Sequence, residues 1–203
     1  MQFSSHYLEQ AVDQLASLPG VGRRTALRLA LDLLKRSDIE LNDFISAISA
    51  LQSNVQNCLQ CGNITDNITC HICDNPKRDK SIICVVEDIR DVMAIESTNS
   101  FEGIYHVLGG LISPMDGVGP QQLNIASLPE RIQSGAIKEI ILALSPTMEG
   151  DTTNFYIYKK IKELDIIVSR ISRGIAVGSE LQYADELTLG RSLQQRQLFE
   201  LTQ

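Results

Sequence analysis

Four of the five cysteines in this 203-residue chain fall into two pairs with the spacing of metal ligands. Cys58 and Cys61 form the first pair, Cys70 and Cys73 form the second, and eight residues lie between the pairs. A structural zinc ion takes four ligands at tetrahedral corners, and cysteine thiolates serve well as these ligands. Each Cys-x-x-Cys turn supplies two thiolates, so the spacing predicts one structural zinc ion per chain.

The alternative for these residues is a set of unligated, redox-active thiols. Paired cysteines in a reducing compartment favour metal binding over that alternative. Four thiolates would close the metal shell and leave no open position for a substrate, so the metal is expected to be structural. His71 is then expected to be a solvated neighbour, and Cys84, within an apolar run, a small buried hydrophobic residue.

A glycine-containing turn with the sequence LPGVG, at residues 18–22, separates two stretches with helical periodicity. Gly20 and Gly22 lack a Cβ atom, so the backbone here can approach another backbone closely. The first amides of the helix that follows have no partner within the helix and form a natural phosphate site. The turn therefore predicts a contact with the DNA backbone.

Basic residues cluster beside this turn, at Arg23, Arg24 and Arg28. Between Leu18 and Arg36 the chain carries five basic residues and one acidic residue, a local charge of +4. Contacts of this kind would be independent of base sequence and sensitive to salt. The alternative is an ordinary helix–turn–helix corner whose arginines are simply solvated.

The whole chain is acidic, with a formal charge of −7 and a pI near 5.0. A basic footprint covering the whole molecule is therefore excluded, and DNA binding requires a local patch or several copies of one. The absence of tryptophan and an aromatic content of 5% disfavour a base-stacking platform.

Three carboxylates lie at or beyond the ends of two predicted strands, namely Glu87 at the end of the first and Glu149 and Asp151 after the third. Sites in open α/β sheets lie outside the carboxyl ends of the strands, and clustered carboxylates can hold Mg²⁺. The alternative is that Asp88 and Asp151 stabilise helix N-termini. The spacing leaves both interpretations open. His106 is expected to pack inside a strand, and the sequence contains no recognisable catalytic triad.

These residues need a scaffold, and apolar periodicity predicts one. Helical spacing is present at residues 8–16, 23–35 and 41–52, and later near 92–95 and at 128–133, 152–164 and 184–199. Strands are predicted at 81–87, 105–108, 139–144 and 166–171. Strands that alternate with helices predict a largely parallel α/β sheet. No apolar stretch is long enough to span a membrane and the N-terminus lacks a secretory pattern, so we expect a cytoplasmic protein without membrane contact.

The order of motifs resembles the RecR family of recombination mediators over nearly the whole chain. After the hairpin and the cysteines come VVED at 85–88, SPMDGVGP at 113–120, SPTMEGDTT at 145–153 and ELQYADELTL at 180–189. The resemblance implies a multi-part α/β protein. Its expected parts are a helix-hairpin-helix domain (1–53), a four-cysteine zinc knuckle (54–80), a Toprim domain (81–176) and a C-terminal Walker B-like motif with an oligomerisation helix (177–203).

The resemblance also implies a function in recombinational DNA repair independent of RecBC. Members act with RecO and RecF to help load the strand-exchange recombinase on single-stranded or gapped DNA, near the nucleoid. They form dimers and ring-like tetramers, which would bring several cationic patches to one opening. A departure from the family pattern occurs at Val177-Gly178-Ser179, where members often show Gly-Gly-Asp.

Toprim domains of topoisomerases and primases bind Mg²⁺ through a glutamate and an Asp-x-Asp pair. Glu87 matches the glutamate, and Glu149 replaces the first aspartate of the pair that Asp151 completes. The resemblance implies no catalysis, so no catalytic residue is assigned. The alternatives are a Mg²⁺-dependent nuclease or topoisomerase-like enzyme, and a structural zinc protein without DNA contact.

Overall fold

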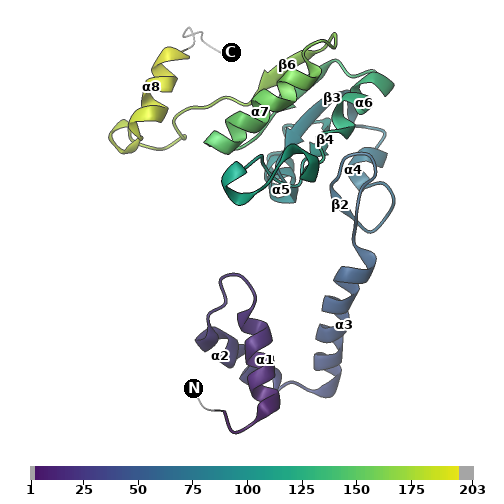
Figure 1. Cartoon of the computed structure of the whole chain (residues 1–203), viewed down its shortest axis with the longest axis vertical. Coiled ribbons are helices and arrows are strands. Elements are labelled where there is room, and N and C mark those ends of the chain that lie inside the picture. Colours follow the sequence, from purple (N-terminus) through teal and green to yellow (C-terminus); the bar gives the residue numbers. More distant parts are fainter. Residues whose placement is uncertain (1–2, 197–203) are drawn as a thin grey trace. The chain divides into compact units, whose positions relative to one another are not determined.

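The computed structural model describes residues 3–196, and its chain divides into two compact units, Met1–Val55 and Gln56–Gln203 (Figure 1). The first unit is helical, with α1 (His6–Ala16), α2 (Arg23–Leu33) and α3 (Asp38–Asn54). The second contains a four-stranded sheet, its covering helices and a small two-stranded sheet. No helix in the described part of the chain is long and apolar enough to cross a membrane.

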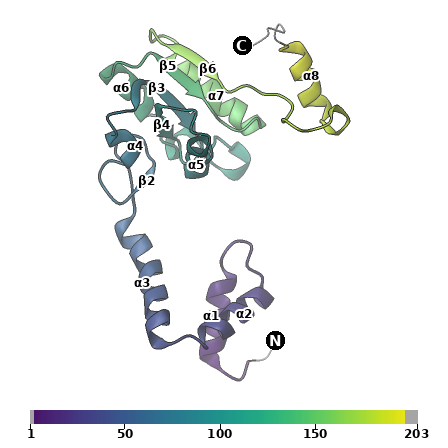
Figure 2. The same ribbon diagram turned by 180° about the vertical axis from the view of Figure 1, so that it is seen from behind.

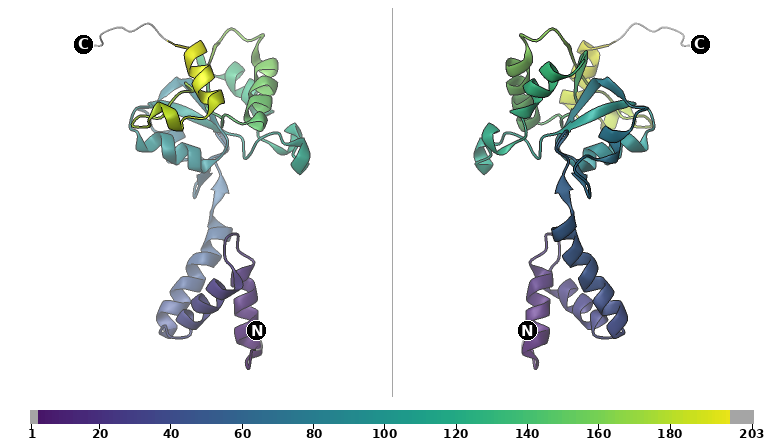
Figure 3. Two further views of the ribbon diagram at one scale, coloured as in Figure 1. Left: turned by 90° about the vertical axis from the view of Figure 1, so that its left-hand side faces the viewer. Right: turned by 90° about the vertical axis from the view of Figure 1, so that its right-hand side faces the viewer.

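Helices α1 and α2 pack side by side in the first unit, as the views of Figure 3 show. Val12 of α1 and Ala26 and Ala30 of α2 form the buried contact, because small residues let the two helices approach closely. The predicted helix at 41–52 is longer in the structure and begins at Asp38. Ser37 and Glu40 form a capping box there, in which each side chain accepts a backbone N–H, so the helix starts one residue after Ser37.

The four-stranded sheet of the second unit is entirely parallel and has the order β4-β3-β5-β6. Its strands are β3 (Asp79–Val86), β4 (Gly103–Val107), β5 (Glu139–Leu142) and β6 (Ile167–Arg170). The helices of this unit are α4 (His71–Asp74), α5 (Ile89–Ser97), α6 (Ser127–Ser134), α7 (Met148–Ile161) and α8 (Glu186–Gln194). Three short 3₁₀ turns occur at Pro114–Asp116, Pro120–Gln122 and Leu181–Tyr183. The predicted largely parallel α/β sheet is confirmed.

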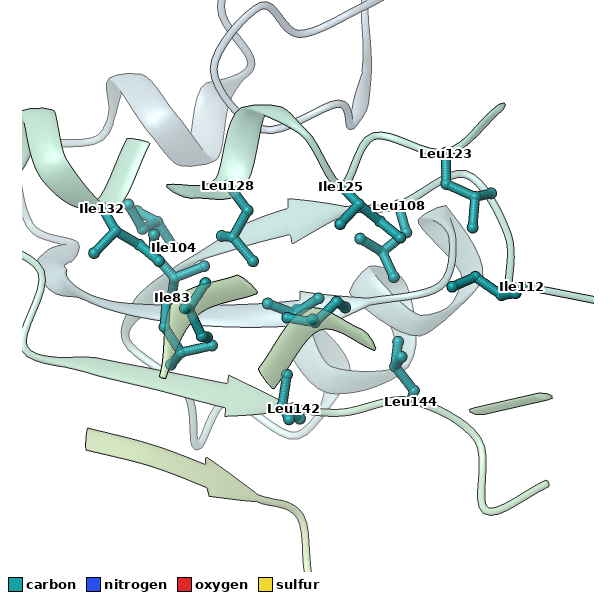
Figure 4. Packing of buried hydrophobic residues seen from close by; sticks show 14 residues of the cluster. Ile83, Ile104, Leu108, Ile112, Leu123, Ile125, Leu128, Ile132, Leu142 and Leu144 are labelled. Carbon is teal, nitrogen blue, oxygen red and sulfur yellow. The ribbon is translucent and has the colours of Figure 1, made fainter. Parts of the chain in front are cut away.

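Central strand β3 is buried on both faces, and alternate residues point to different cores. Ile83 and Val85 join the larger core, which α6 and α7 cover and Figure 4 shows from close by. Cys84 and Val86 join a second core on the opposite face, with Val92 of α5 and the paired cysteines. This arrangement agrees with the views in Figures 1 and 2, in which α7 and α5 lie on opposite sides of the sheet. A central strand buried on both faces explains why the sequence IICVV, residues 82–86, is apolar throughout instead of alternating.

The C-terminal part of the second unit follows β6 as an irregular segment that leads to α8. The predicted helix at 184–199 begins at Glu186, because the side chain of Asp185 caps it by accepting the N–H of Thr188 at 2.8 Å. Helix α8 ends at Gln194, earlier than predicted, and residues 197–199 of the prediction lie outside the described residues. At the departure from the family pattern, Gly178 adopts a φ of +85°, a conformation that favours glycine.

The glycine in the first turn of α7 is required by close packing. A Cβ atom at Gly150 would lie 1.9 Å from the carbonyl oxygen of Ser145. We therefore expect Gly150→Ala to lower the free energy of unfolding by about 1–3 kcal/mol, measured by urea denaturation. Gly190→Ala is the matched control, since that helical glycine has open space around it and alanine is the better helix former. Equal stability of the two variants would contradict this packing.

His106 is fully buried in β4, as its position within an apolar strand predicted. Burial lowers its pKa to about 4, although a hydrogen bond between Nε2 and the carbonyl of Asn124, at 2.6 Å, acts in the opposite direction. The nearby guanidinium of Arg131 also disfavours the charged imidazole. The neutral ring is therefore part of the folded state.

This depressed pKa makes stability depend on pH with a definite sign. The unfolded histidine titrates near pH 6.5, so the unfolded chain binds the proton first. Stability is then complete above about pH 7 and is lost towards pH 4, by about 3 kcal/mol at most. Urea denaturation across this range should show a shallower dependence for His106→Gln than for the wild type. The exposed His6→Gln serves as the control and should follow the wild-type curve.

Candidate metal centre and nucleic-acid interface

The paired cysteines are positioned by a short hairpin and a single helical turn. Strands β1 (Gln56–Asn57) and β2 (Ile64–Thr65) pair antiparallel, and Cys58 and Cys61 lie in the loop between them. Cys70 is the N-cap of α4, and Cys73 lies in that helix. The hairpin and the helical turn together bring the two Cys-x-x-Cys segments face to face.

All four thiols are buried, and their sulfur atoms lie within 4.8 Å of one another. The Sγ atoms of Cys61 and Cys70 are 3.6 Å apart. Backbone amides point at the sulfurs, since the N–H of Cys70 donates to Sγ of Cys58 at 3.3 Å and that of Asn63 to Sγ of Cys61 at 3.4 Å. All five cysteines of the chain are free of disulfides. The geometry fits a four-coordinate metal ion.

Without a cation, the close packing of the thiols makes it unfavourable for all of them to be ionised. Burial raises the pKa of Cys58, but backbone amides, led by that of Cys70, outweigh it and lower that pKa to about 7. A hydrogen bond with Cys73, followed by burial, raises the pKa of Cys61. Neighbouring thiols thus cannot all ionise together in isolation, whereas a divalent cation would deprotonate them. The donor set therefore fits the metal ion that the spacing predicted.

This cysteine knuckle, defined here as residues 56–75, is packed onto the end of β4. The N–H of Val107 donates to the carbonyl of Cys61 at 2.7 Å. Gly62 adopts a φ of +76°, and a Cβ atom there would lie 2.8 Å from the carbonyl oxygen of Val107. His71 is exposed and Cys84 is buried, as predicted. The requirement for glycine at position 62 was not visible from the spacing of the cysteines.

Removal of the metal should therefore affect the sheet as well as the knuckle. After chelation, we expect the amide of Val107 to exchange with solvent at least about tenfold faster, because its acceptor is the carbonyl of a metal ligand. Hydrogen exchange followed by NMR or mass spectrometry measures this effect. The amide of Ala26, which donates to Gly22 at 2.9 Å in the other compact unit, is the internal control and should keep its rate. Unchanged protection at Val107 would show that the knuckle is independent of the sheet.

The hairpin glycines occupy the turn between α1 and α2. Gly20 has a φ of +79°, and the N–H of Val21 donates to the carbonyl of Leu18 at 3.1 Å to close the turn. Gly22 is the N-cap of α2 and provides no side-chain cap. The first turn of α2 contains no acidic residue. No acidic side chain in the first turn of α2 therefore opposes an anion at this helix end, and the phosphate contact expected there stays a prediction.

The three arginines beside the turn differ in their surroundings. Nη2 of Arg23 forms ion pairs with Asp13 at 3.0 Å and with Glu9 at 3.8 Å, both on α1. Arg24 and Arg28 are exposed and form no ion pair within residues 3–196. Arg24 and Arg28 are therefore the arginines beside the turn whose charge is not engaged in an ion pair within residues 3–196, while Arg23 is held against α1. Sequence spacing treated the three alike because it cannot show the acidic face of α1.

The carboxylates at the end of the sheet have separate partners. Glu87 follows β3 and is half-buried, and burial, followed by repulsion from Asp91 and Asp88, raises its pKa. Asp88 caps α5 by accepting the N–H of Arg90 at 2.8 Å, as the capping interpretation predicted. The carboxylate of Asp91 accepts the N–H of Glu87 at 3.0 Å.

The other two carboxylates lie in the first turn of α7, whose N-cap is Thr147 and not Asp151. Glu149 is exposed, whereas Asp151 accepts a hydrogen bond from Nη1 of Arg173 at 3.1 Å. Within the described part of the chain, the four cysteines are the one group that brings three or more metal-ligating atoms together. A magnesium site at Glu87, Glu149 and Asp151 stays a prediction, and the role of Arg173 was missed because its partner is distant in sequence.

The helical hairpin, the cysteine knuckle and the parallel sheet define a protein that joins a helix-hairpin-helix region to a Toprim domain. Family models match the chain as "RecR, helix-hairpin-helix" at residues 8–51, "Toprim domain" at 81–172 and "RecR, C-terminal" at 174–197.

Curated relatives of similar length agree with these models. Recombination protein RecR of Flavobacterium psychrophilum is 58% identical over 98% of this chain and 97% of its own. The proteins of that name from Flavobacterium johnsoniae and Bacteroides thetaiotaomicron are each 57% identical, over 100% and 98% of this chain and 98% and 97% of their own. The chain therefore belongs to the RecR family of recombination proteins.

Proposed function

We propose that this chain is a DNA-binding recombination mediator in a RecBC-independent, RecFOR-type repair pathway. It acts with RecO and RecF to help load the strand-exchange recombinase on single-stranded or gapped DNA. The observation that carries this proposal is the full-length similarity to proteins named Recombination protein RecR. It works in the cytoplasm, in association with the nucleoid.

The proposed DNA contact is the hairpin at the start of α2. Gly20 and Gly22 present backbone amides, and Arg24 and Arg28 add positive charge without a competing ion pair in the described structure. Arg23 contributes to the same patch while its ion pair with Asp13 orients it. Contacts of this type recognise phosphates and not base sequence, so both single-stranded and double-stranded DNA would bind.

The proposed metal is one structural Zn²⁺ per chain, held by Cys58, Cys61, Cys70 and Cys73. Four buried thiols favour zinc over hard cations such as Mg²⁺. A closed thiolate shell has no place for a substrate, and zinc here would supply folding energy alone. In the proposed domain division, a zinc-finger region at residues 54–80, which contains the cysteine knuckle, separates the hairpin domain (1–53) from the Toprim domain (81–176). A C-terminal region with the Walker B-like motif (177–203) follows.

The proposed working form is a homodimer or a ring-like homotetramer. Helix α3 buries none of its residues, and its apolar face of Phe44, Ile45, Ile48 and Leu51 is exposed. An exposed apolar face of this kind marks an interaction surface. Several copies of the cationic hairpin at one opening would bind DNA although each chain carries a net charge of −7.

We propose that the chain itself catalyses no reaction. A mediator needs surfaces that hold DNA and partner proteins, whereas a Toprim nuclease would need Glu87, Glu149 and Asp151 to share a metal ion. Labelled DNA incubated with the protein and Mg²⁺ is therefore expected to remain intact. Cleavage that Glu87→Ala abolishes would instead establish the enzyme.

The DNA contact is tested by reversing charge at the open arginines. The variant with Arg24→Glu and Arg28→Glu should bind DNA at least about tenfold more weakly. The slope of log affinity against log salt should also fall by about one for each phosphate that the variant no longer neutralises. Fluorescence anisotropy at several salt concentrations measures both, and zinc content should not change. Arg23→Glu with Arg24→Glu should also weaken binding, but part of that loss would come from disturbing α1.

A matched control applies the same charge change elsewhere. Lys159→Glu with Lys162→Glu alters two exposed residues at the end of α7 and should leave DNA affinity nearly unchanged. Equal losses in both variants would mean that net charge, and not the hairpin, governs binding. Mass measurement in solution with DNA and RecO tests assembly and the adaptor role together.

A further inference from the structure

The ion pair between Asp151 and Arg173 occupies the end of the sheet where a Toprim domain would bind its metal ion. Asp151 lies in the first turn of α7, and Arg173 follows the last residue of β6, Arg170, by three positions. The guanidinium binds the carboxylate through both of its terminal nitrogens, with Nη1 at 3.1 Å from Oδ2 and Nη2 bonded to Oδ1. Such a two-bonded pair is geometrically specific and among the strongest of its kind.

The surroundings of this pair are cationic. Arg173 lowers the pKa of Asp151 mainly through the hydrogen bonds, and the charges of Arg191 and Arg170 lower it further. The side chain of Arg173 is 14% exposed, so its charge is largely withdrawn from water. A divalent cation at Asp151 would therefore meet three positive charges and a carboxylate of which each oxygen already accepts a hydrogen bond from Arg173.

The carboxylates present do not fit a magnesium ion. Mg²⁺ demands near-octahedral oxygen ligands and is usually held by one or two carboxylates. Both oxygens of Asp151 are taken by Arg173, Glu149 is exposed, and Glu87 is half-buried beside the separately engaged Asp88 and Asp91. Within residues 3–196 these three carboxylates do not form a group close enough to share an ion.

We infer that Arg173 is the resident cation of this acidic site, and that its pair with Asp151 anchors the C-terminal segment, residues 174–196, to the α/β sheet. The pair stands at the junction of the two matched regions, since the Toprim match ends at residue 172 and the C-terminal match begins at 174. The carboxylate that holds a metal ion in catalytic Toprim domains holds the protein's own chain here.

Apart from this pair, the segment is held by partial burial, since residues 188–192 of α8 are half-buried. Helix α8 buries none of its residues, and Leu187 is 62% exposed. Between α8 and the end of the sheet lies a cavity of about 470 Å³, lined by Arg173, Arg191 and Leu144 among others. The segment therefore has little apolar packing. The ion pair between Asp151 and Arg173, which lies directly before the segment, consequently contributes much of what fixes its direction.

Hydrogen exchange of the full-length, zinc-loaded protein tests the anchor. Arg173→Gln and Asp151→Asn should each speed exchange across residues 174–194 by about tenfold. The matched control is Arg170→Gln, an exposed arginine of β6 for which no ion pair is found in residues 3–196. Reversing the pair, with Asp151→Arg and Arg173→Asp, should restore slow exchange. The anchor is refuted if Arg173→Gln exchanges at the same rate as Arg170→Gln.

A second measurement tests the claim about the metal. Mn²⁺ is added at millimolar concentration to the zinc-loaded wild type and to Asp151→Asn, and its binding is followed by electron paramagnetic resonance. The two proteins should bind Mn²⁺ equally, because Asp151 already has its cation. Binding by the wild type that Asp151→Asn abolishes would overturn the inference. Neither measurement involves DNA, so its outcome is separable from the proposed function.

Discussion

The double burial of strand β3 is the constraint on which the second unit depends. A parallel strand in the middle of a sheet needs cover on both faces. Helices α6 and α7 cover one face with a large aliphatic core, whereas α5 and the cysteine knuckle cover the other. The knuckle has too few apolar residues for a core of its own. Its four thiols join Val86 and Tyr105 in the second core, so the energy of binding a metal ion there would become part of the folding energy of the sheet.

Charge is distributed unevenly over the chain. The net charge of −7 coexists with a short helix, α2, whose first turn contains no acidic residue and whose arginines are exposed. The acidic face of α1 binds one of those arginines, Arg23, and leaves Arg24 and Arg28 directed to solvent. At the end of the sheet, the neutralised group is an acidic residue, because Arg173 forms an ion pair with the carboxylate of Asp151. Local pairing, and not total charge, therefore decides which surface can hold a polyanion.

Several elements were predictable because their causes are local. Cys58, Cys61, Cys70 and Cys73 follow a spacing that only tight turns satisfy, and the structure brings their sulfurs together. The four parallel strands were readable from short apolar runs separated by helical periodicity. Helix ends were less accurate, since α3 begins at Asp38, directly after the Ser37 cap and three residues before its first predicted residue. Such caps depend on single hydrogen bonds that apolar periodicity does not report.

By itself, the sequence determined the four-cysteine cluster, the glycine turn, the strand order along the chain and the resemblance to the RecR family, because each depends on short motifs and on their order along the chain. Only the tertiary structure decided which charged side chains form ion pairs with one another. Arg23 meets Asp13 across the hairpin, and Arg173 meets Asp151 across the sheet. The need for glycine at position 62, in the loop between β1 and β2, likewise arises from Val107 of β4. These contacts join residues separated by many positions, and their partners are set by how helices and strands pack, which no local spacing encodes.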